Sequence, residues 1–157
     1  MRCVPEQLLS VHKQNAPNGL SDRPGPAAIR NRANAGQATI LFVEDEPALR
    51  MLAKRILERQ GYQVRDAATG TEALEIWKNH KSNFDVLVTD MMMPAGLSGE
   101  ELARTLTSEK PELKVLYVSG YGYDPLRGGS ALAQAEFLGK PYAPTALLAA
   151  VGRALAC

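Results

Sequence analysis

The chain has 157 residues, which is enough for one domain with a full hydrophobic core. Its net charge of +1, with 45% hydrophobic and 22% charged residues, gives no electrostatic reason to bind nucleic acid or an anionic membrane. No apolar run approaches the roughly eighteen residues that span a bilayer. Cys3 and Cys157 show neither metal-ligand nor disulfide spacing, so we expect a reducing compartment and a cytoplasmic protein.

Residues 1–37 differ in composition from the rest of the chain. They contain four prolines, five Lys or Arg residues and only two Asp or Glu residues. Such a segment buries too little apolar surface to offset the entropy that it would lose on folding. We therefore predict a flexible tail or linker at 1–37 and a folded domain at 38–157.

From residue 38 onward, apolar strand patterns alternate with amphipathic helix patterns. Strands are predicted at 38–43, 62–67, 84–89, 113–118 and 136–138. Helices are predicted to begin at Pro47, after Thr69, after Ser98 and at Pro144, with a short fifth helix within 130–135. Five β–α units with right-handed crossovers predict an α/β fold with a doubly wound, five-stranded parallel sheet.

Local signals support these helices. Pro47 suits a first helical position, and Gly61 is placed to end that helix. Residues 69–72 and 98–101 have the Ser/Thr-x-x-Glu form of a capping box. The first helix carries an apolar stripe that we expect to face the core, formed by Leu49, Leu52, Ala53 and Ile56.

Polar side chains follow four of the predicted strands, at the point where each strand ends. These residues are Glu44 and Asp45, Asp90, Ser119, and Lys140. In open α/β sheets, ligands bind outside the carboxyl ends of the strands, at a switch point in the strand order. The order 2-1-3-4-5 fits best, because it makes the acids of the first and third strands neighbours.

Three acids at this edge would place like charges within a few ångströms of one another. Such a cluster either takes up protons or holds a hard cation. Two carboxylates and one backbone carbonyl from the loop after Asp90 would suit Mg²⁺, which prefers oxygen ligands and keeps several waters. Asp90 could then act as a nucleophile, while Ser119 and Lys140 stabilise phosphoryl oxygens. The pattern predicts a metal-assisted phosphoryl site.

Each of these polar residues also has an ordinary structural explanation. An acid pair before a helix commonly complements the helix dipole, and an Asp at a strand end commonly caps a turn. A lysine before a proline is usually in a solvated loop. The functional interpretation rests on the conjunction of four strand ends, each with the group that the chemistry needs.

Four motifs together resemble the receiver domain of response regulators, the aspartate-phosphorylated half of two-component signalling, over residues 38–156. They are Val43-Glu44-Asp45-Glu46-Pro47, Thr89-Asp90-Met91-Met92-Met93-Pro94, Val118-Ser119-Gly120 and Gly139-Lys140-Pro141. The resemblance implies a flavodoxin-like fold with five helices. It also implies that Asp90 is the phosphoacceptor and that Glu44, Asp45, Asp90 and the Met92 carbonyl bind Mg²⁺.

The same resemblance assigns further roles. Ser119 would be the switch hydroxyl, Lys140 the phosphate-bridging lysine and Phe137 the aromatic switch residue, with a cis Lys140–Pro141 bond. The loop 93–99 is one residue longer than in the commonest receivers and is similar to receivers appended to hybrid histidine kinases. A single-domain receiver and the C-terminal receiver of a hybrid kinase both remain open.

The expected function is a phosphorylation-dependent switch that changes its partner-binding surface. It would accept phosphate from a sensor histidine kinase or a histidine phosphotransfer protein and act on an unknown output protein, with no direct contact to nucleic acid or membrane. The domain would catalyse only its own phosphorylation and dephosphorylation. Two alternatives are a small Mg²⁺-dependent aspartyl-phosphate hydrolase and a phosphorylation-independent adaptor. Dinucleotide binding is excluded, because no Gly-x-Gly-x-x-Gly follows the first strand.

Overall fold

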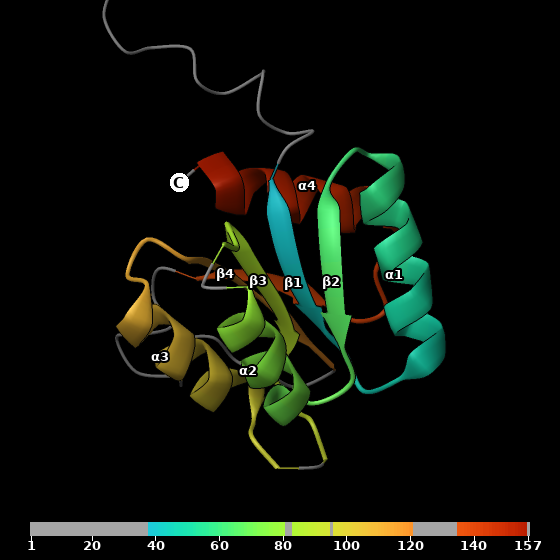
Figure 1. Cartoon of the computed structure of the whole chain (residues 1–157). Coiled ribbons are helices and arrows are strands. Elements are labelled where there is room, and N and C mark those ends of the chain that lie inside the picture. The colour runs from blue at the N-terminus through green and yellow to red at the C-terminus, as the bar shows by residue number, and fades with distance from the viewer. Residues whose placement is uncertain (1–37, 81–82, 95, 121–134, 157) are drawn as a thin grey trace, which may run out of the picture.

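Five short parallel strands form one sheet in the order β2-β1-β3-β4-β5 (Figure 1), as the sequence predicts. The computed structural model describes residues 38–80, 83–94, 96–120 and 135–156. The strands are β1 (Thr39–Val43), β2 (Gln63–Ala67), β3 (Val86–Asp90), β4 (Lys114–Ser119) and β5 (Glu136–Gly139).

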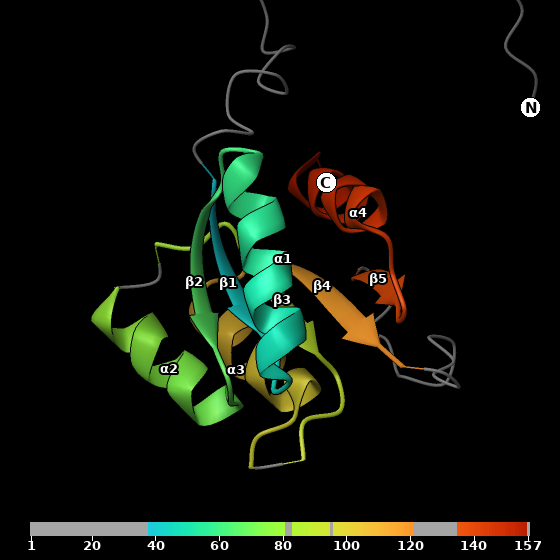
Figure 2. The ribbon, with the colours of Figure 1, turned by 90° about the vertical axis from the view of Figure 1, so that its right-hand side faces the viewer.

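Four helices flank the sheet within the described residues: α1 (Pro47–Arg59), α2 (Gly70–Asn79), α3 (Gly99–Glu109) and α4 (Pro144–Ala156). Helices α1 and α4 cover one face of the sheet, and α2 and α3 cover the other (Figures 1 and 2). None of these helices is long and apolar enough to cross a membrane. The tail at 1–37 and nearly all of the short helix predicted within 130–135 lie outside the described residues.

The strands alternate their side chains between two hydrophobic cores. In β1, Ile40 and Phe42 join α1 and α4, whereas Leu41 and Val43 join α2 and α3. All four side chains are almost inaccessible to solvent. A central parallel strand covered on both faces should be apolar throughout, and β1 meets that requirement.

The predicted helix boundaries are mostly confirmed. Pro47 is the first residue of α1, and Gly61, with a φ of 98°, follows the end of that helix. Ser98 and Glu101 form a complete capping box on α3. On α2, Thr69 accepts a hydrogen bond from the Glu72 amide, but the Glu72 carboxylate reaches the Ala68 amide instead of that of Thr69.

The predicted apolar stripe of α1 is only partly buried. Ala53 and Leu57 form the buried line of this helix, while Leu52 is 55% exposed. The buried face of α1 differs from the predicted apolar stripe, because α1 packs against both the sheet and α4. Its outer apolar residues line a groove of about 330 Å³ between α1 and the start of α4, described below.

The strand register aligns the carboxyl ends of neighbouring strands. Val43 pairs with Thr89, so the next residues, Glu44 and Asp90, lie level with each other. Ser119 pairs with Gly139, which brings Lys140 to the same edge. The sheet therefore gathers residues that are up to 96 positions apart in the chain.

A substitution at Gly152 tests the stability of α4, away from the carboxyl edge of the sheet. It is exposed within α4, and an added Cβ would meet nothing within 4 Å. Gly152→Ala should therefore raise the free energy of unfolding by about 1 kcal/mol, the usual helix-propensity difference. Urea unfolding followed by the fluorescence of Trp77, the only tryptophan and a buried one, measures this change. A destabilised variant would contradict the α4 packing.

Candidate functional site

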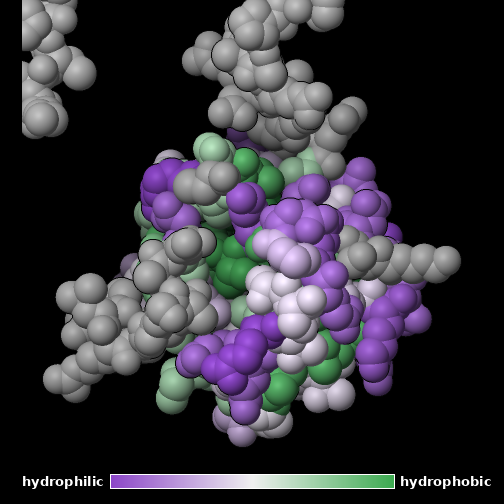
Figure 3. Space-filling model, turned by 90° about the vertical axis from the view of Figure 1, so that its left-hand side faces the viewer, coloured by the Kyte–Doolittle hydropathy of each residue, from purple (hydrophilic) through white to green (hydrophobic). Residues whose placement is uncertain are grey.

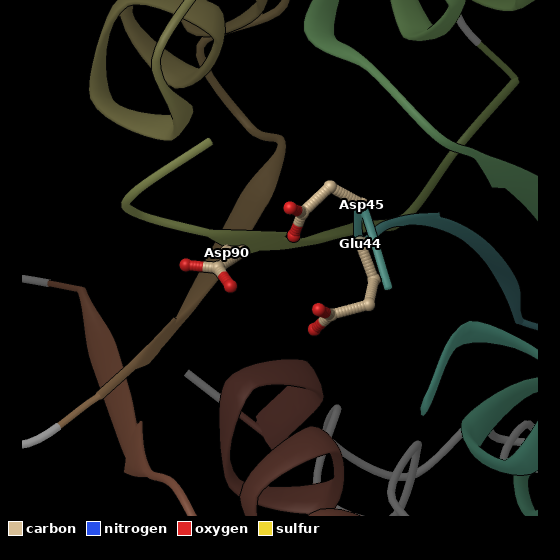
Figure 4. Close-up of side chains that lie close together, drawn as sticks. All are labelled: Glu44, Asp45 and Asp90. Atoms are coloured by element: carbon tan, nitrogen blue, oxygen red, sulfur yellow. The ribbon is translucent and has the colours of Figure 1, made fainter. Parts of the chain in front are cut away.

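Three carboxylates converge at the carboxyl edge of the sheet. Glu44 and Asp45 follow β1, and Asp90 is the last residue of β3. One oxygen from each lies within 4.8 Å of the other two. Figure 4 shows the three side chains turned toward a common space. Among the described residues, this is the one group of acids, histidines or cysteines placed closely enough to hold a metal ion.

The three acids differ in their exposure to solvent. Glu44 is 1% exposed and Asp90 is 7% exposed, whereas Asp45 is open to solvent. Burial raises the pKa of Glu44, because a charged carboxylate loses hydration there. The hydrogen bond and charge of Lys140 lower this pKa, but they do not outweigh the burial.

Lys140 lies between the two buried acids. Its Nζ is 2.6 Å from Oδ2 of Asp90, and 2.9 and 2.7 Å from the two carboxylate oxygens of Glu44. Burial alone would lower the pKa of this ammonium. The hydrogen bonds and charges of Asp90 and Glu44 reverse that effect, so the pKa of Lys140 is raised. Lys140 therefore remains charged at neutral pH.

The charges at this site are incompletely balanced. Three carboxylates against one ammonium leave two negative charges when all are ionised. The donors are hard oxygen atoms, which suit Mg²⁺ and not a soft metal. The charge and chemistry of the cluster therefore fit a bound divalent cation such as Mg²⁺.

Backbone and side-chain hydrogen bonds hold Asp90 in place. The Met92 amide donates to Oδ1 of Asp90 at 2.9 Å, and the Thr89 hydroxyl donates to the Asp90 carbonyl at 3.0 Å. The Met92 side chain itself is 79% exposed. The sequence indicated the position of Met92 beside Asp90 but not this amide contact.

Ser119 and Phe137 lie at different distances from the acids. Ser119 is buried one position beyond Val118, which pairs with Asp90, and its carbonyl accepts a hydrogen bond from the Lys140 amide at 2.7 Å. Phe137 lies farther back on β5, where its ring stacks on Tyr117 with centroids 5.4 Å apart. The predicted cis bond between Lys140 and Pro141 is confirmed.

Three half-buried apolar side chains, one of them from this aromatic pair, pack against the same core. Val115, Ala135 and Phe137 pack against the core that includes α3. Figure 3 views the molecule from the side of α3 and shows hydrophobic residues in the middle of this face, with hydrophilic residues above, below and to the right.

Arg50 is a residue of this region that sequence reasoning missed. Its Nη1 donates to the Glu44 carbonyl at 2.8 Å, and its Nε lies 3.4 Å from an oxygen of Asp66. Arg50 thus ties the turn that carries the acids to β2. Its position one turn into α1, within reach of the turn before the helix, was the signal available in the sequence.

The fold and the acidic edge together define a receiver-type domain, and comparison with known families agrees. The family described as "Response regulator receiver domain" matches residues 40–152. The chain belongs to this family.

Two curated relatives come from Brucella abortus (strain 2308). The chain is 43% identical to the sensor kinase CckA over 109 residues, which are 69% of this chain but 11% of that protein. It is 35% identical to the response regulator receiver protein CpdR over 104 residues, 66% of this chain and 84% of that protein. The chain thus spans only a small part of the kinase and most of CpdR.

Solved structures show the same fold. The receiver domain from the hybrid histidine kinase CckA has a TM-score of 0.64 and 35% identity, with coverage of 75% of this chain and 99% of that chain. A receiver domain protein from Clostridium thermocellum has a TM-score of 0.66 and 32% identity, with coverage of 76% and 94%. The protein therefore contains a receiver domain of two-component signalling, and the hydrolase and adaptor alternatives are not favoured.

Glu44→Gln tests the electrostatics of the metal-free site. The folded-state pKa of Glu44 lies above its ordinary value, so ionisation favours the unfolded state. The stabilising effect of Gln should therefore grow as the pH rises from the ordinary pKa of a glutamate to the folded-state pKa of Glu44, stay constant above it, and vanish in acid where Glu44 is protonated in both states. Urea unfolding in EDTA across this pH range measures it. A difference that does not change with pH would contradict this assignment.

Proposed function

We propose that Asp90 accepts a phosphoryl group from a phosphohistidine donor and that this event switches the partner-binding surface of the domain. Glu44, Asp45, Asp90 and the backbone carbonyl of Met92 would hold Mg²⁺. The observation that carries the proposal is the position of Lys140, whose ammonium contacts the two buried acids together. A cation held there can stabilise phosphoryl oxygens next to Asp90.

The proposed transfer needs no protein group other than those at this edge. A carboxylate oxygen of Asp90 attacks phosphorus, the phosphorus–nitrogen bond breaks, and the imidazole nitrogen keeps the electron pair and takes up a proton from solvent. When bound, Mg²⁺ supplies positive charge to the oxygens of the transferred group. Lys140 and Ser119 provide an ammonium and a hydroxyl for the same oxygens. In this sense the domain would catalyse its own phosphorylation, and attack of water on the phosphorus, with release of inorganic phosphate, would return Asp90 to its carboxylate.

The switch follows from the added charge. A phosphoryl group carries about −1.5 to −2 charge and three strong acceptor oxygens. Lys140, now shared between Glu44 and Asp90, would be drawn toward these oxygens together with Ser119. Phe137 is the residue expected to turn inward beside Ser119. Its stacking with Tyr117 would then be lost, so the surface at β4 and β5 would change.

Labelling of Asp90 tests this function directly. Incubation with acetyl phosphate and Mg²⁺ should add one phosphoryl group to the protein, measured by intact mass, and EDTA should prevent it. Asp90→Asn should abolish the label because the nucleophile is lost. Asp85→Asn is the matched control, since Asp85 lies at the opposite end of β3, where its carboxylate accepts a hydrogen bond from the Thr39 amide.

The outcome also separates the alternatives. Stoichiometric labelling on Asp90 supports the receiver function, whereas steady turnover of a phosphate ester would favour a hydrolase. Partner binding that is unchanged by Asp90→Ala and by Mg²⁺ would favour an adaptor.

We further propose that the phosphodonor docks on the apolar groove beside α1. A donor must bring its imidazole to Asp90, so it must cover the surface around Lys140. The groove reaches from α1 to Lys140 and exposes Leu52. Figure 2 shows α1 and α4 side by side on this face. The groove is lined by Leu49, Leu52, Ala53, Ile56, Gly120, Lys140, Pro141, Tyr142 and Pro144.

Leu52→Glu tests this docking surface. A charge in the groove should slow phosphotransfer from a phosphorylated histidine phosphotransfer protein by about tenfold, the effect of about 1.4 kcal/mol at an interface. Labelling by acetyl phosphate should not change, because that donor is too small to use the groove. Met51→Glu is the matched control: Met51 is equally exposed on α1 but does not line the groove. Equal slowing by both substitutions would rule out the groove.

A further inference from the structure

The loop between β3 and α3 carries Met92 and rests on two glycines from other parts of the fold. Gly99 is the first residue of α3, and Gly70 is the first residue of α2. Both glycines are buried. The loop itself contains Gly96, whose φ of 81° favours glycine at that turn. Met92 therefore lies in a loop that meets one of these glycines at each end.

Gly99 holds the start of the loop. A Cβ at this position would overlap the Asp90 carbonyl oxygen, so the backbones can approach this closely only because residue 99 has no side chain. The Gly99 amide also donates to the Met91 carbonyl at 3.3 Å. Gly99 thus fixes the two residues before Met92.

Gly70 holds the other end of the loop. A Cβ there would lie 2.8 Å from the carbonyl oxygen of Leu97 and 2.9 Å from its Cβ. Leu97 packs against the core beside α2 and α3, so it has little room to withdraw. The backbone around Gly70 is itself fixed, because the Glu72 amide donates to Thr69 and the Glu72 carboxylate accepts from the Ala68 amide.

We infer that Gly70 is a positioning residue for the metal-binding loop, acting through Leu97 on Met92, although it lies twenty positions before Asp90. The inference rests on the proposed Mg²⁺ site. A side chain at position 70 must displace Leu97, which lies in the same loop as Met92, while Gly99 holds Asp90 and Met91 at the start of that loop. Residues that orient metal ligands from outside commonly change metal affinity by about 10- to 100-fold.

Gly70→Ala tests the inference in the full chain. We expect Mg²⁺ affinity, measured by isothermal titration with the metal alone, to fall about tenfold. The hydrogen-exchange rate of the Met92 amide in metal-free protein should rise, because its bond to Asp90 is disturbed. Gly152→Ala is the matched control, since it makes the same chemical change where nothing lies within 4 Å. Unchanged Mg²⁺ affinity in Gly70→Ala would overturn the inference.

A second variant keeps the test sound should Gly70→Ala fold poorly. Leu97→Gly removes the side-chain part of the same contact from the loop side and leaves α2 intact, and it should also weaken Mg²⁺ binding. If both substitutions act through this one contact, the double variant should lose no more Mg²⁺ affinity than the single variant that binds Mg²⁺ more weakly. Effects that multiply would instead mean two independent disturbances, and would overturn the proposed route through Leu97.

The metal-free measurement separates this inference from the proposed function. If the wild-type protein bound no Mg²⁺, the proposed metal site would fail. A faster Met92 amide exchange in Gly70→Ala would still support the positioning role. If the wild type bound Mg²⁺ and was labelled on Asp90, while Gly70→Ala behaved like Gly152→Ala in both measurements, the positioning role alone would fail.

Discussion

The contact of Lys140 with two buried carboxylates is the interaction on which the site depends. Glu44 is almost inaccessible to solvent, and Asp90 lies beside it. Two buried like charges are tolerated only with a counter-charge or a proton, and the single ammonium of Lys140 contacts both. Burial nevertheless raises the pKa of Glu44, so one ammonium compensates the cluster incompletely. The remaining negative charge suits a divalent cation, which would balance it.

The sheet makes this arrangement possible because it fixes the acids and the lysine independently. Glu44 follows β1, Asp90 ends β3 and Lys140 follows β5, and the register sets all three level without help from any loop. Met92 differs, because it lies on a loop whose place depends on close backbone contacts at Gly70 and Gly99. The proposed site would thus combine ligands held by the strands with one ligand on a loop that contacts α2 and α3.

The fold and the acids could be predicted because their signals are local. The apolar runs, the capping residues Ser98 and Thr69 and the polar residues after each strand are all visible in the sequence, and the strand order followed from the need to place Glu44 beside Asp90. The sharing of Lys140 between Glu44 and Asp90 could not be predicted, and the position of Arg50 one turn into α1 indicated only that it could reach the turn, since both contacts depend on side-chain directions after packing. The stripe of α1 was misplaced for a related reason: periodicity identifies an apolar face, but not how that face is divided between the sheet and a neighbouring helix.

Lys140 also connects chemistry with recognition, because it contacts Asp90 and lines the apolar groove beside α1. If phosphorylation draws its ammonium toward the phosphoryl oxygens, the wall of the groove changes as well. A partner in the groove would then bind the two phosphorylation states with different free energies. By thermodynamic reciprocity, that partner must shift the free energy of phosphorylation by the same amount. A donor that favours the unphosphorylated groove would therefore be released by its own reaction, which is the behaviour that a phosphotransfer encounter requires.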